Sequence, residues 1–369
     1  MGEISKIVGG GTPSTSNPEY WNGNINWYSP IEIGDSIYKR ESKKKISELG
    51  LKKSSAKILP PGTILYTSRA GIGKTAILAK SGSTNQGFQS IIPLEDVLDS
   101  YFIYSRTEEL RIYGEKYGSG STFNEISGKQ LEKMPIKIPT IEEQKYISQF
   151  VKHLDYIVTL HQGSINILEE LKKAYLKEMF ADNVNKIPNL RLNGFRKEWE
   201  QHKLGEIFNI FDNLRVPVKS SNRIYGNTPY YGANGIQDYV EGFTHKGEFI
   251  LLAEDGANNL DNYPVHYVNG KVWVNNHAHV LQGKAEFIDN KFAVYLLRKT
   301  NIRKFLVGGG RAKLNANIMM QILLTIPILS EQIPIGQLLY QFDELIELHQ
   351  RKLNKLEKLK TSYLNKMFL

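Results

Sequence analysis

The end of this chain repeats its own middle. When residues 138–180 are shifted forward by 188 positions without a gap, they align with residues 326–368, and nineteen of the forty-three pairs are identical. Asp155, for example, aligns with Asp343. Self-similarity at a fixed offset indicates a repeated structural plan. We therefore predict two copies of one arrangement, each a globular body followed by a helix.

Both repeated segments have the apolar pattern of a long amphipathic helix. The heptad positions are Ile147, Leu154, His161, Leu168 and Tyr175 in the first segment and Ile335, Phe342, His349, Leu356 and Tyr363 in the second. A seven-residue repeat keeps one stripe facing a partner helix. Each segment predicts roughly 38 residues of helix, about 55 Å long. Because such a stripe would expose much apolar surface alone, we expect the helices to pack as an antiparallel coiled coil with the bodies at opposite ends.

His161 and His349 occupy the same place in the two stripes. One interpretation is a polar pair that fixes the register of the coiled coil. The other is a histidine at the edge of the seam that is hydrogen-bonded to the partner helix. A metal site is not predicted, because neither histidine has a second histidine four residues later and the chain has no cysteine.

The composition indicates a soluble protein of the cytoplasm. With no cysteine, disulfides and thiolate metal sites are excluded. The chain has no long uninterrupted apolar run, and Met1, Gly2 and Glu3 do not open a signal peptide. We expect no membrane contact.

The positive charge lies in the bodies. The net charge is +9, of which residues 1–139 carry +4 and residues 183–328 carry +6, whereas the helical segments together carry −1. Two basic bodies on a near-neutral spacer are suited to contacting a polyanion at two places.

Each body has the mixed pattern of an α/β (α+β) domain. Strand-like runs include residues 62–67, 76–79 and 90–93 in the first body and 248–253, 264–268 and 271–274 in the second, with helical stretches near residues 99–116 and 289–306. The predicted domains are residues 1–139 (first body), 140–182 (central helix), 183–328 (second body) and 329–369 (C-terminal helix). The two bodies share only short matching segments, so we expect one scaffold with two different binding surfaces and a pseudo-twofold internal repeat.

Candidate catalytic motifs are incomplete. Residues 68–75 resemble a phosphate-binding loop, but Ser68 stands where the first glycine is needed, and a strand rather than a helix is expected to follow. Residues 16–20, which end in Tyr20, resemble part of an amino-methyltransferase motif but lack its second proline. The histidines at 245, 266, 277 and 279 lack the acidic spacing of a metal site. We predict no catalytic residue and no metal.

Polar and basic side chains in the glycine- and asparagine-rich loops are the candidate DNA contacts. Arginine and lysine neutralise phosphates, and asparagine and glutamine amides can bond adenine with two hydrogen bonds. In the first body the candidates are Thr12, Ser14, Lys43, Lys45, Lys52, Arg69, Lys74, Asn85, Gln86 and Gln89. In the second they are Arg215, Lys219, Tyr231, Asn234, Asn258, Asn259, Asn275, Asn276, His277, Arg311 and Lys313. Ordinary turn chemistry and solvated surface charge explain many such residues equally well.

The combination of these features resembles the specificity subunit of type I restriction–modification systems. The motifs that carry it are residues 138–144 and 326–332, which contain Pro–x–x–x–Glu–Gln, the paired helices that end in Tyr–Leu–x–x–Met–Phe, and residues 204–207 at the start of the second body. The resemblance covers nearly the whole chain. It implies two target-recognition domains that each read half of a split DNA sequence.

The resemblance also implies the partners. Two methyltransferase subunits and the restriction or motor subunits would assemble on this chain in a bacterial defence complex. Adenine methylation would use S-adenosylmethionine, and restriction would use ATP and Mg²⁺, all bound by those partners. This chain would hold no cofactor and would be no enzyme.

The first body departs from the pattern in one respect. The second body is entered through residues 195–204, whereas the first starts almost directly at Gly2. We expect an edge strand of the first body to be absent or supplied elsewhere.

Two other functions remain open from the sequence. The first is an enzyme that acts alone, an ATPase or methyltransferase built on the loops at Lys74 or Tyr20. The second is a coiled-coil scaffold that binds only protein.

Overall fold

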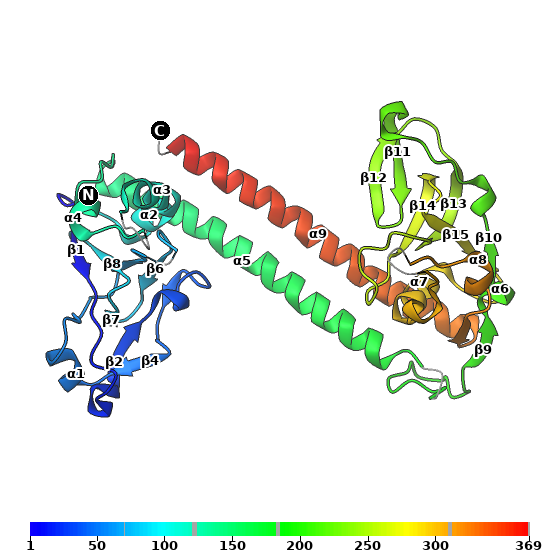
Figure 1. The fold of residues 1–369 in the computed structure, drawn as a ribbon, viewed down its shortest axis with the longest axis horizontal. Helices are drawn as coiled ribbons and strands as arrows, with labels where there is room; N and C mark the ends of the chain where they lie inside the picture. Colours follow the sequence, from blue (N-terminus) through cyan, green and yellow to red (C-terminus); the bar gives the residue numbers. More distant parts are fainter. Residues whose placement is uncertain (70, 120–123, 182–184, 309–311, 368–369) are drawn as a thin grey trace. The chain divides into compact units, whose positions relative to one another are not determined.

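The chain folds into two units joined by two long helices. The computed structural model describes residues 1–69, 71–119, 124–181, 185–308 and 312–367. Unit 1 comprises Met1–Leu160 and Leu353–Leu369, and unit 2 comprises His161–Lys352. Each unit holds one α/β body and a part of each long helix (Figure 1). The predicted fold class is confirmed.

Unit 1 is built on two sheets. A five-stranded sheet has the order β1-β8-β5-β6-β3, with only the β3–β6 pair parallel. A smaller sheet has the order β4-β2-β7, in which β2 and β7 are parallel. The strands are β1 (Ser5–Gly9), β2 (Trp21–Tyr28), β3 (Tyr38–Lys39), β4 (Lys44–Ile46), β5 (Ile64–Tyr66), β6 (Thr75–Leu78), β7 (Ser83–Thr84) and β8 (Gln89–Pro93). The short helices are α1 (Glu48–Lys52), α2 (Ser100–Ser105), α3 (Thr107–Tyr117), α4 (Gly128–Glu132), η1 (Pro18–Tyr20) and η2 (Pro30–Glu32).

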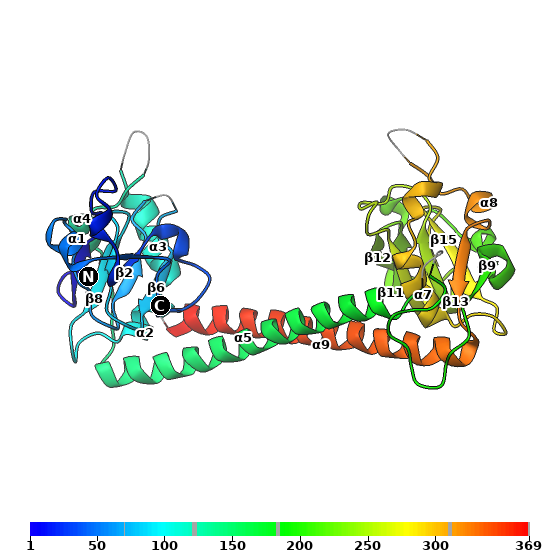
Figure 2. The ribbon, with the colours of Figure 1, turned by 90° about the horizontal axis from the view of Figure 1, so that it is seen from below.

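Unit 2 has one large sheet and one short ribbon. The six-stranded sheet has the order β10-β15-β13-β14-β11-β12, with β11 and β14 parallel. Helix α7 contacts β13, β14 and β15 of this sheet (Figure 2). The strands are β9 (Glu200–Lys203), β10 (Phe208–Ile210), β11 (Tyr225–Gly232), β12 (Gly235–Val240), β13 (His245–Ala253), β14 (Val265–Val274), β15 (Ala278–Gly283) and β16 (Leu323–Ile326). The helices are α6 (Leu204–Ile207), α7 (Asn290–Lys299), α8 (Ala316–Met319), η3 (Asp212–Leu214), η4 (Ser220–Asn222) and η5 (Ile302–Phe305).

The two long helices, α5 (Ile141–Glu178) and α9 (Leu329–Met367), pack together in each unit. In unit 1 the ring of Phe150 lies 5.2 Å from that of Tyr363, and Lys360 pairs with Asp155. In unit 2 Lys172 pairs with Asp343. Numbers rise along α5 as they fall along α9, so the helices are antiparallel. The two lysine–aspartate pairs are equivalent under the internal repeat.

The apolar stripe is buried unevenly. Leu154 and Ile335 of the heptad positions are buried. So are four apolar residues that stand three or four positions from heptad residues: Val151, Ile165, Leu339 and Leu353. Ile147, Leu168, Tyr175, Phe342 and Leu356 are half-buried, and Tyr363 is exposed at the edge of the seam. None of the described helices combines the length and apolar character that a membrane span requires.

Each long helix is docked onto its body by a buried glutamine. The Gln144 side chain accepts from the N–H of Asp99 and donates to the carbonyls of Val97 and Pro139, at 2.9, 3.0 and 3.0 Å. Asp99 in turn caps α2 by accepting from the N–H of Phe102. These bonds tie the helix start to the body in unit 1.

Unit 2 repeats this docking arrangement. Gln332 accepts from the N–H of Asp289 and donates to the carbonyls of Phe287 and Pro327, at 3.0, 2.8 and 2.7 Å. Asp289 caps α7 through the N–H of Phe292. The recurring Glu–Gln pair of the sequence repeat therefore contains the residue that joins helix and body.

His161 and His349 meet through their Nδ1 atoms, which lie 2.9 Å apart. One ring must donate and the other accept, so the contact is compatible with neutral rings and loses its hydrogen bond when both are protonated. Burial lowers the pKa of His161, and the charges of His349 and Lys352 lower it further. The folded state therefore binds fewer protons than the unfolded state, whose histidine pKa is about 6.5.

We expect acidification to weaken the helix pair through this contact. The stabilisation is present above about pH 6.5 and is lost as the pH falls through the folded-state pKa. Melting followed by circular dichroism should show a larger fall in Tm between pH 7.5 and pH 5 for the natural chain than for the double variant H161Q/H349Q. His153→Gln, which changes a histidine bonded to the carbonyl of Gln149 on the surface of α5, should keep the natural pH dependence. An identical pH dependence in the double variant would contradict this assignment.

Candidate nucleic-acid interface

Both units build the same asparagine turn at the end of a parallel strand pair. In unit 1 the N–H of Asn85 donates to the carbonyl of Tyr28 at 3.0 Å, and its Oδ1 accepts from the N–H of Gly87 at 2.8 Å. In unit 2 the N–H of Asn275 donates to the carbonyl of Tyr231 at 3.0 Å, and its Oδ1 accepts from His277 at 2.8 Å. An asparagine that bonds backbone two residues ahead fixes a tight turn.

Predicted residues of unit 1 gather around this turn. Thr12 donates through its hydroxyl to Gln86, and the side chain of Gln89 lies against Gly9. The guanidinium of Arg69 lies beside Gly87 and is 3.9 Å from the carboxylate of Glu125. The structure thus brings together three separate segments of the chain, which supply Thr12, Arg69 and the group Asn85, Gln86 and Gln89.

Close backbone approach in this cluster requires glycine. A Cβ on Gly10 would lie 1.9 Å from the carbonyl oxygen of Asn85, which no real side chain could occupy. The loop at residues 9–12 is therefore held directly against the turn, and the polar side chains on both are displayed from a fixed backbone.

The other predicted residues of unit 1 lie elsewhere in its body. Ser14 bonds to Ser16, and the backbone N–H of Lys43 donates to Glu32. Lys45 lies on β4 and Lys52 on α1, in and beside the small sheet. None of these contacts joins the four residues to the turn at Asn85.

Lys74 lies in a tight turn that is no phosphate-binding loop. The Thr67 hydroxyl donates to the carbonyl of Gly71 and accepts from the N–H of Lys74. Strand β6 follows the loop immediately, as the sequence predicts, where a phosphate-binding loop is followed by a helix. The exposed Lys74 side chain remains available for a phosphate contact.

In unit 2 an asparagine cluster lines a cavity of about 730 Å³. The side chain of Asn234 donates to the carbonyl of Gly256 and accepts from the N–H of Asn258, both at 2.9 Å. Oδ1 of Asn259 accepts from the N–H groups of Asp261 and Asn262. The same cavity is lined by the cationic side chains Lys172, Lys177, Arg298 and Lys299.

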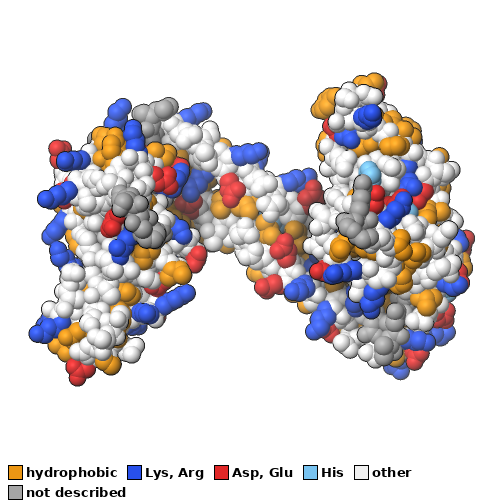
Figure 3. Space-filling view, in the orientation of Figure 1, with side chains coloured by type: hydrophobic (Ala, Val, Ile, Leu, Met, Phe, Trp, Pro, Cys, Tyr) orange, Lys and Arg blue, Asp and Glu red, His pale blue; other side chains and the backbone are white. Residues whose placement is uncertain are grey.

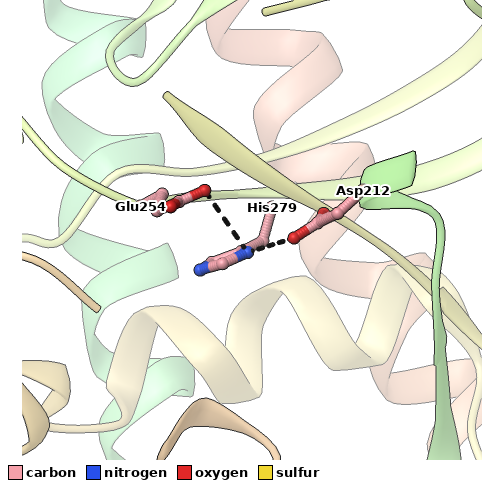
Figure 4. Close-up of side chains that lie close together, drawn as sticks. All are labelled: Asp212, Glu254 and His279. Atoms are coloured by element: carbon pink, nitrogen blue, oxygen red, sulfur yellow. Dashed lines mark hydrogen bonds and ion pairs between the residues drawn. The ribbon is translucent and has the colours of Figure 1, made fainter. Parts of the chain in front are cut away.

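An ionic cluster stands beside the turn of unit 2 (Figure 4). The Nδ1 atom of His279 lies 2.5 Å from an oxygen of Asp212 and 3.8 Å from one of Glu254. Arg215 and Lys313 reach Glu254 at 2.5 and 2.6 Å. Burial acts to raise the pKa of Glu254. The hydrogen bonds from Lys313 and Arg215, together with the charges of His279 and Arg215, outweigh burial, and the pKa lies below its usual value.

This cluster is better explained as an ion-pair network than as a metal site. Asp212, Glu254 and His279 offer three ligand atoms close enough to hold a cation. Two protein cations already bond Glu254, and Arg215 also lies 3.3 Å from Asp212. The carboxylates are therefore neutralised without a metal, and Arg215 is held inside the body while Lys313 stays half-exposed.

The two units place different side chains on the same frame. In unit 1 the N–H of Ser68 donates to the carbonyl of Gly87, and its carbonyl accepts from Ile126. In unit 2 Glu254 makes the same two backbone bonds, to His277 and Leu314. A neutral serine in one unit thus corresponds to a charged glutamate in the other, and the two turns must differ in the groups that they present.

The remaining predicted residues of unit 2 differ in accessibility. Asn275 is buried, and its side-chain oxygen is occupied by the hydrogen bond within the turn. Asn276 next to it is exposed. His277 pairs with Asp255 at 2.5 Å, and Tyr231 is half-buried with its pKa raised by burial. Lys219 is exposed, and Arg311 lies outside the described residues.

The acidic residues beside the candidate DNA contacts of unit 2 were not predicted from the sequence. Asp212, Glu254 and Asp255 hold Arg215, Lys313, His277 and His279 in place, but carboxylates in a basic body attract no attention as DNA contacts. The signal that could have found Glu254 is its position at the end of a predicted strand, in a body where His277 and His279 alternate along another segment. On the face drawn in Figure 3, lysine and arginine side chains are spread over each unit among acidic and neutral ones.

A family model described as "Type I restriction modification DNA specificity domain" matches residues 1–170 and 196–358. The type I restriction enzyme MjaIX specificity subunit of Methanocaldococcus jannaschii is 30% identical over 80% of this chain and 74% of its own length. The EcoprrI specificity subunit of Escherichia coli is 25% identical over 94% of this chain and 87% of its own length.

One relative has a higher sequence identity over a shorter part of the chain, and a solved structure has the same fold. A putative type I restriction enzyme specificity subunit of Haemophilus influenzae is 51% identical, over 40% of this chain and 38% of its own length. The crystal structure of a type I restriction–modification S subunit from M. genitalium superposes with a TM-score of 0.72 at 18% identity, covering all of this chain and 94% of the other.

Proposed function

The chain belongs to the family of type I restriction–modification DNA specificity subunits, and on this premise we propose that its two units each recognise one half of a split double-stranded DNA sequence. Members of this family are non-catalytic. The expectation that the chain is no enzyme is thereby confirmed, and the interpretation as a solitary ATPase or methyltransferase is set aside.

The observation that carries the proposal is the shared asparagine turn with different surroundings in the two units. A common frame would present each unit to DNA in the same way, while the differing side chains would select different bases. In unit 1 the exposed Gln86 and half-exposed Asn85, Gln89 and Arg69 are the candidate base contacts. In unit 2 Asn276 and His277 take the corresponding place.

The basic residues outside the turns are assigned to the phosphates. Contacts to phosphate position a protein on the duplex without reading sequence. Lys43, Lys45, Lys52 and Lys74 would act so in unit 1, and Lys219 and Lys313 in unit 2. The fixed backbone of the loops, shown by the tight packing of Gly10, would lower the entropic cost of ordering them on DNA.

The chemistry belongs to the partners. Type I systems use their cofactors in partner subunits. We assign adenine methylation to two methyltransferase subunits that bind S-adenosylmethionine, and translocation and cleavage to restriction subunits that use ATP and Mg²⁺. The exposed face of the helix pair is the proposed docking surface for the methyltransferases.

Methylation profiling tests the whole proposal. Long-read sequencing of DNA from cells that express this chain with its methyltransferase subunit should show methylated adenines in one motif made of two short specified segments and an unspecified gap. Cells with the methyltransferase alone should lack the motif. A single uninterrupted motif, or the same methylation without this chain, would refute the assignment.

A further inference from the structure

Four histidines lie on or beside the large sheet of unit 2, and two of them are fully bonded inside the body. His245 bonds the Thr244 hydroxyl at 2.7 Å and a backbone carbonyl at 3.0 Å through its two ring nitrogens. His279 reaches the carboxylate of Asp212 through Nδ1 and a backbone carbonyl through Nε2. Both rings are almost fully buried. Their nitrogens therefore stabilise the body and are not available to a ligand.

The other two histidines differ in the accessibility of the nitrogen that is left over. Nε2 of His266 bonds none of the described residues, but it is buried and closed to solvent. His277 bonds the carboxylate of Asp255 through Nδ1 at 2.5 Å, and its Nε2 bonds none of the described residues. The side chain of His277 is 37% exposed, against 19% for Asp255. The bond to the less exposed carboxylate therefore turns Nδ1 inward and leaves Nε2 on the side of the ring that faces solvent.

The backbone around His277 is fixed as well as its ring. Its N–H donates to Oδ1 of Asn275 at 2.8 Å, and its carbonyl accepts from the N–H of Glu254 at 2.9 Å. Asp255 follows Glu254 directly and pairs through its backbone with Lys313. The histidine and its carboxylate thus stand on two backbone segments that are bonded to each other. A ring held at its backbone and at one nitrogen loses little entropy when the second nitrogen binds a ligand.

Unit 1 carries neither member of this pair. The residue that matches His277 is Gly87, because the N–H of each donates to the asparagine two residues earlier. A Cβ on Gly87 would lie 2.8 Å from Cγ of Pro30, so a side chain fits there only if the proline moves. The residue that matches Asp255 is Arg69, since each follows the residue whose N–H bonds the turn. A pair that differs while the frame is kept is suited to distinguish one half-site from the other.

Resting on the proposed function, we propose that Nε2 of His277 reads one base pair of the half-site of unit 2 and that Asp255 is the positioning residue for this contact. With the Nδ1 proton bonded to Asp255, the neutral ring has its lone pair on Nε2 and accepts a hydrogen bond there. The groups that donate in the major groove are the amino groups of adenine and cytosine. The group that His277 binds is therefore the amino group of one adenine or cytosine.

The first test is methylation profiling of the natural chain, H277A and H202A, each expressed with the methyltransferase subunit. H277A should relax one base pair in one half of the motif, with discrimination there reduced about tenfold because one base contact is lost, and leave the other half unchanged. H202A changes a half-buried histidine near Glu200 and Glu206, outside the turn, and should keep the natural motif. A natural chain without a split motif would overturn the proposed function and this inference with it. A split motif that H277A leaves unchanged would overturn this inference alone.

A double variant tests the role of Asp255. D255A should relax the same base pair as H277A, and D255A/H277A should relax it no further, because the two residues act as a unit. A merely structural role would lower methylation at every site without changing the preference among bases. Relaxation by D255A at a different base pair, or additive effects of the two changes, would overturn the positioning role.

DNA binding by the purified complexes identifies the group that His277 reads. At the relaxed base pair, the adenine or cytosine is replaced by its analogue without the amino group, and fluorescence anisotropy compares the two duplexes. The natural complex should bind the analogue duplex about tenfold more weakly, whereas the H277A complex should bind both duplexes equally. Equal weakening in both complexes would overturn the assignment. Anisotropy needs only a folded complex, so it also decides the case in which H277A methylates too little for its motif to be read.

Discussion

Replacement of Gln332 by alanine should lower the free energy of unfolding of unit 2 by about 3 kcal/mol. The side chain is fully buried and makes three hydrogen bonds to backbone groups, which alanine would leave without a partner. Each orphaned buried group costs about 1–3 kcal/mol unless water reaches it. The loss should matter most at Asp289, because its N–H bonds Gln332 while its side chain caps the start of α7.

The internal repeat supplies the matched comparison. Gln144→Ala removes the same three bonds in unit 1 and should cause a similar loss there. Native-state hydrogen exchange can read the units separately, through α7 in unit 2 and α2 in unit 1. Gln162→Ala, which removes an exposed side chain bonded to Asn166, should change stability by less than about 0.5 kcal/mol.

Two results would count against this assignment. One is a Gln332 variant that is as stable as the Gln162 variant. The other is a loss of protection in α2 and α7 alike from a change in Gln332 only, because it would show that the glutamine acts globally and not at its own helix–body junction.

The long helices were predictable because they depend on periodicity. The heptad pattern of Ile147 and its successors specifies a stripe, and a stripe of that length has few ways to be buried. The segment 99–116, expected as one helical stretch, is instead two helices that meet at Arg106, whose backbone leaves the helical region. In the second body, residues 265–274 form one strand, β14, where two were expected, and Gly270 adopts a positive φ of 105° inside it. Tertiary packing decides where such elements begin and end, and the secondary-structure propensities of single residues carry no information about that packing.

The interface was predictable in residue type but not in role. Asn85 and Asn275 were selected because their side-chain amides could read adenine. Their Oδ1 atoms instead accept hydrogen bonds from the backbone N–H two residues later in the chain. Arg215 was selected for its charge, yet it lies inside an ion-pair network with Glu254. A sequence gives the chemistry of a side chain, whereas its availability depends on contacts between loops far apart in the chain, such as that of Thr12 with Gln86.

Exchange of residues 1–139 for the corresponding body of another family member should change one half of the methylated motif and leave the other half unchanged. If each unit reads its half independently, the loss of two or three two-bonded base contacts, at about 1–3 kcal/mol each, should weaken recognition of the original half-site by about 100-fold or more. The structure restricts the choice of donor, because the incoming body must still dock onto α5. Asp99 bonds the side chains of Gln144 and Ser148, through its N–H and its carboxylate, and Tyr101 donates to Asp155 at 2.7 Å.

The donor should therefore carry aspartate and tyrosine at these two positions. A matched exchange that also contains D99A and Y101F should fold poorly in unit 1. Ser148 and the N–H of Phe102 lose the carboxylate of Asp99, and Asp155 loses the hydroxyl of Tyr101. Methylation profiling of both exchanges separates recognition from assembly: the first should yield a new half-site joined to the old one, and the second should yield little methylation at either. A first exchange that altered both halves would show that the two units read DNA jointly, and the assignment of one half-site to each unit would then be wrong.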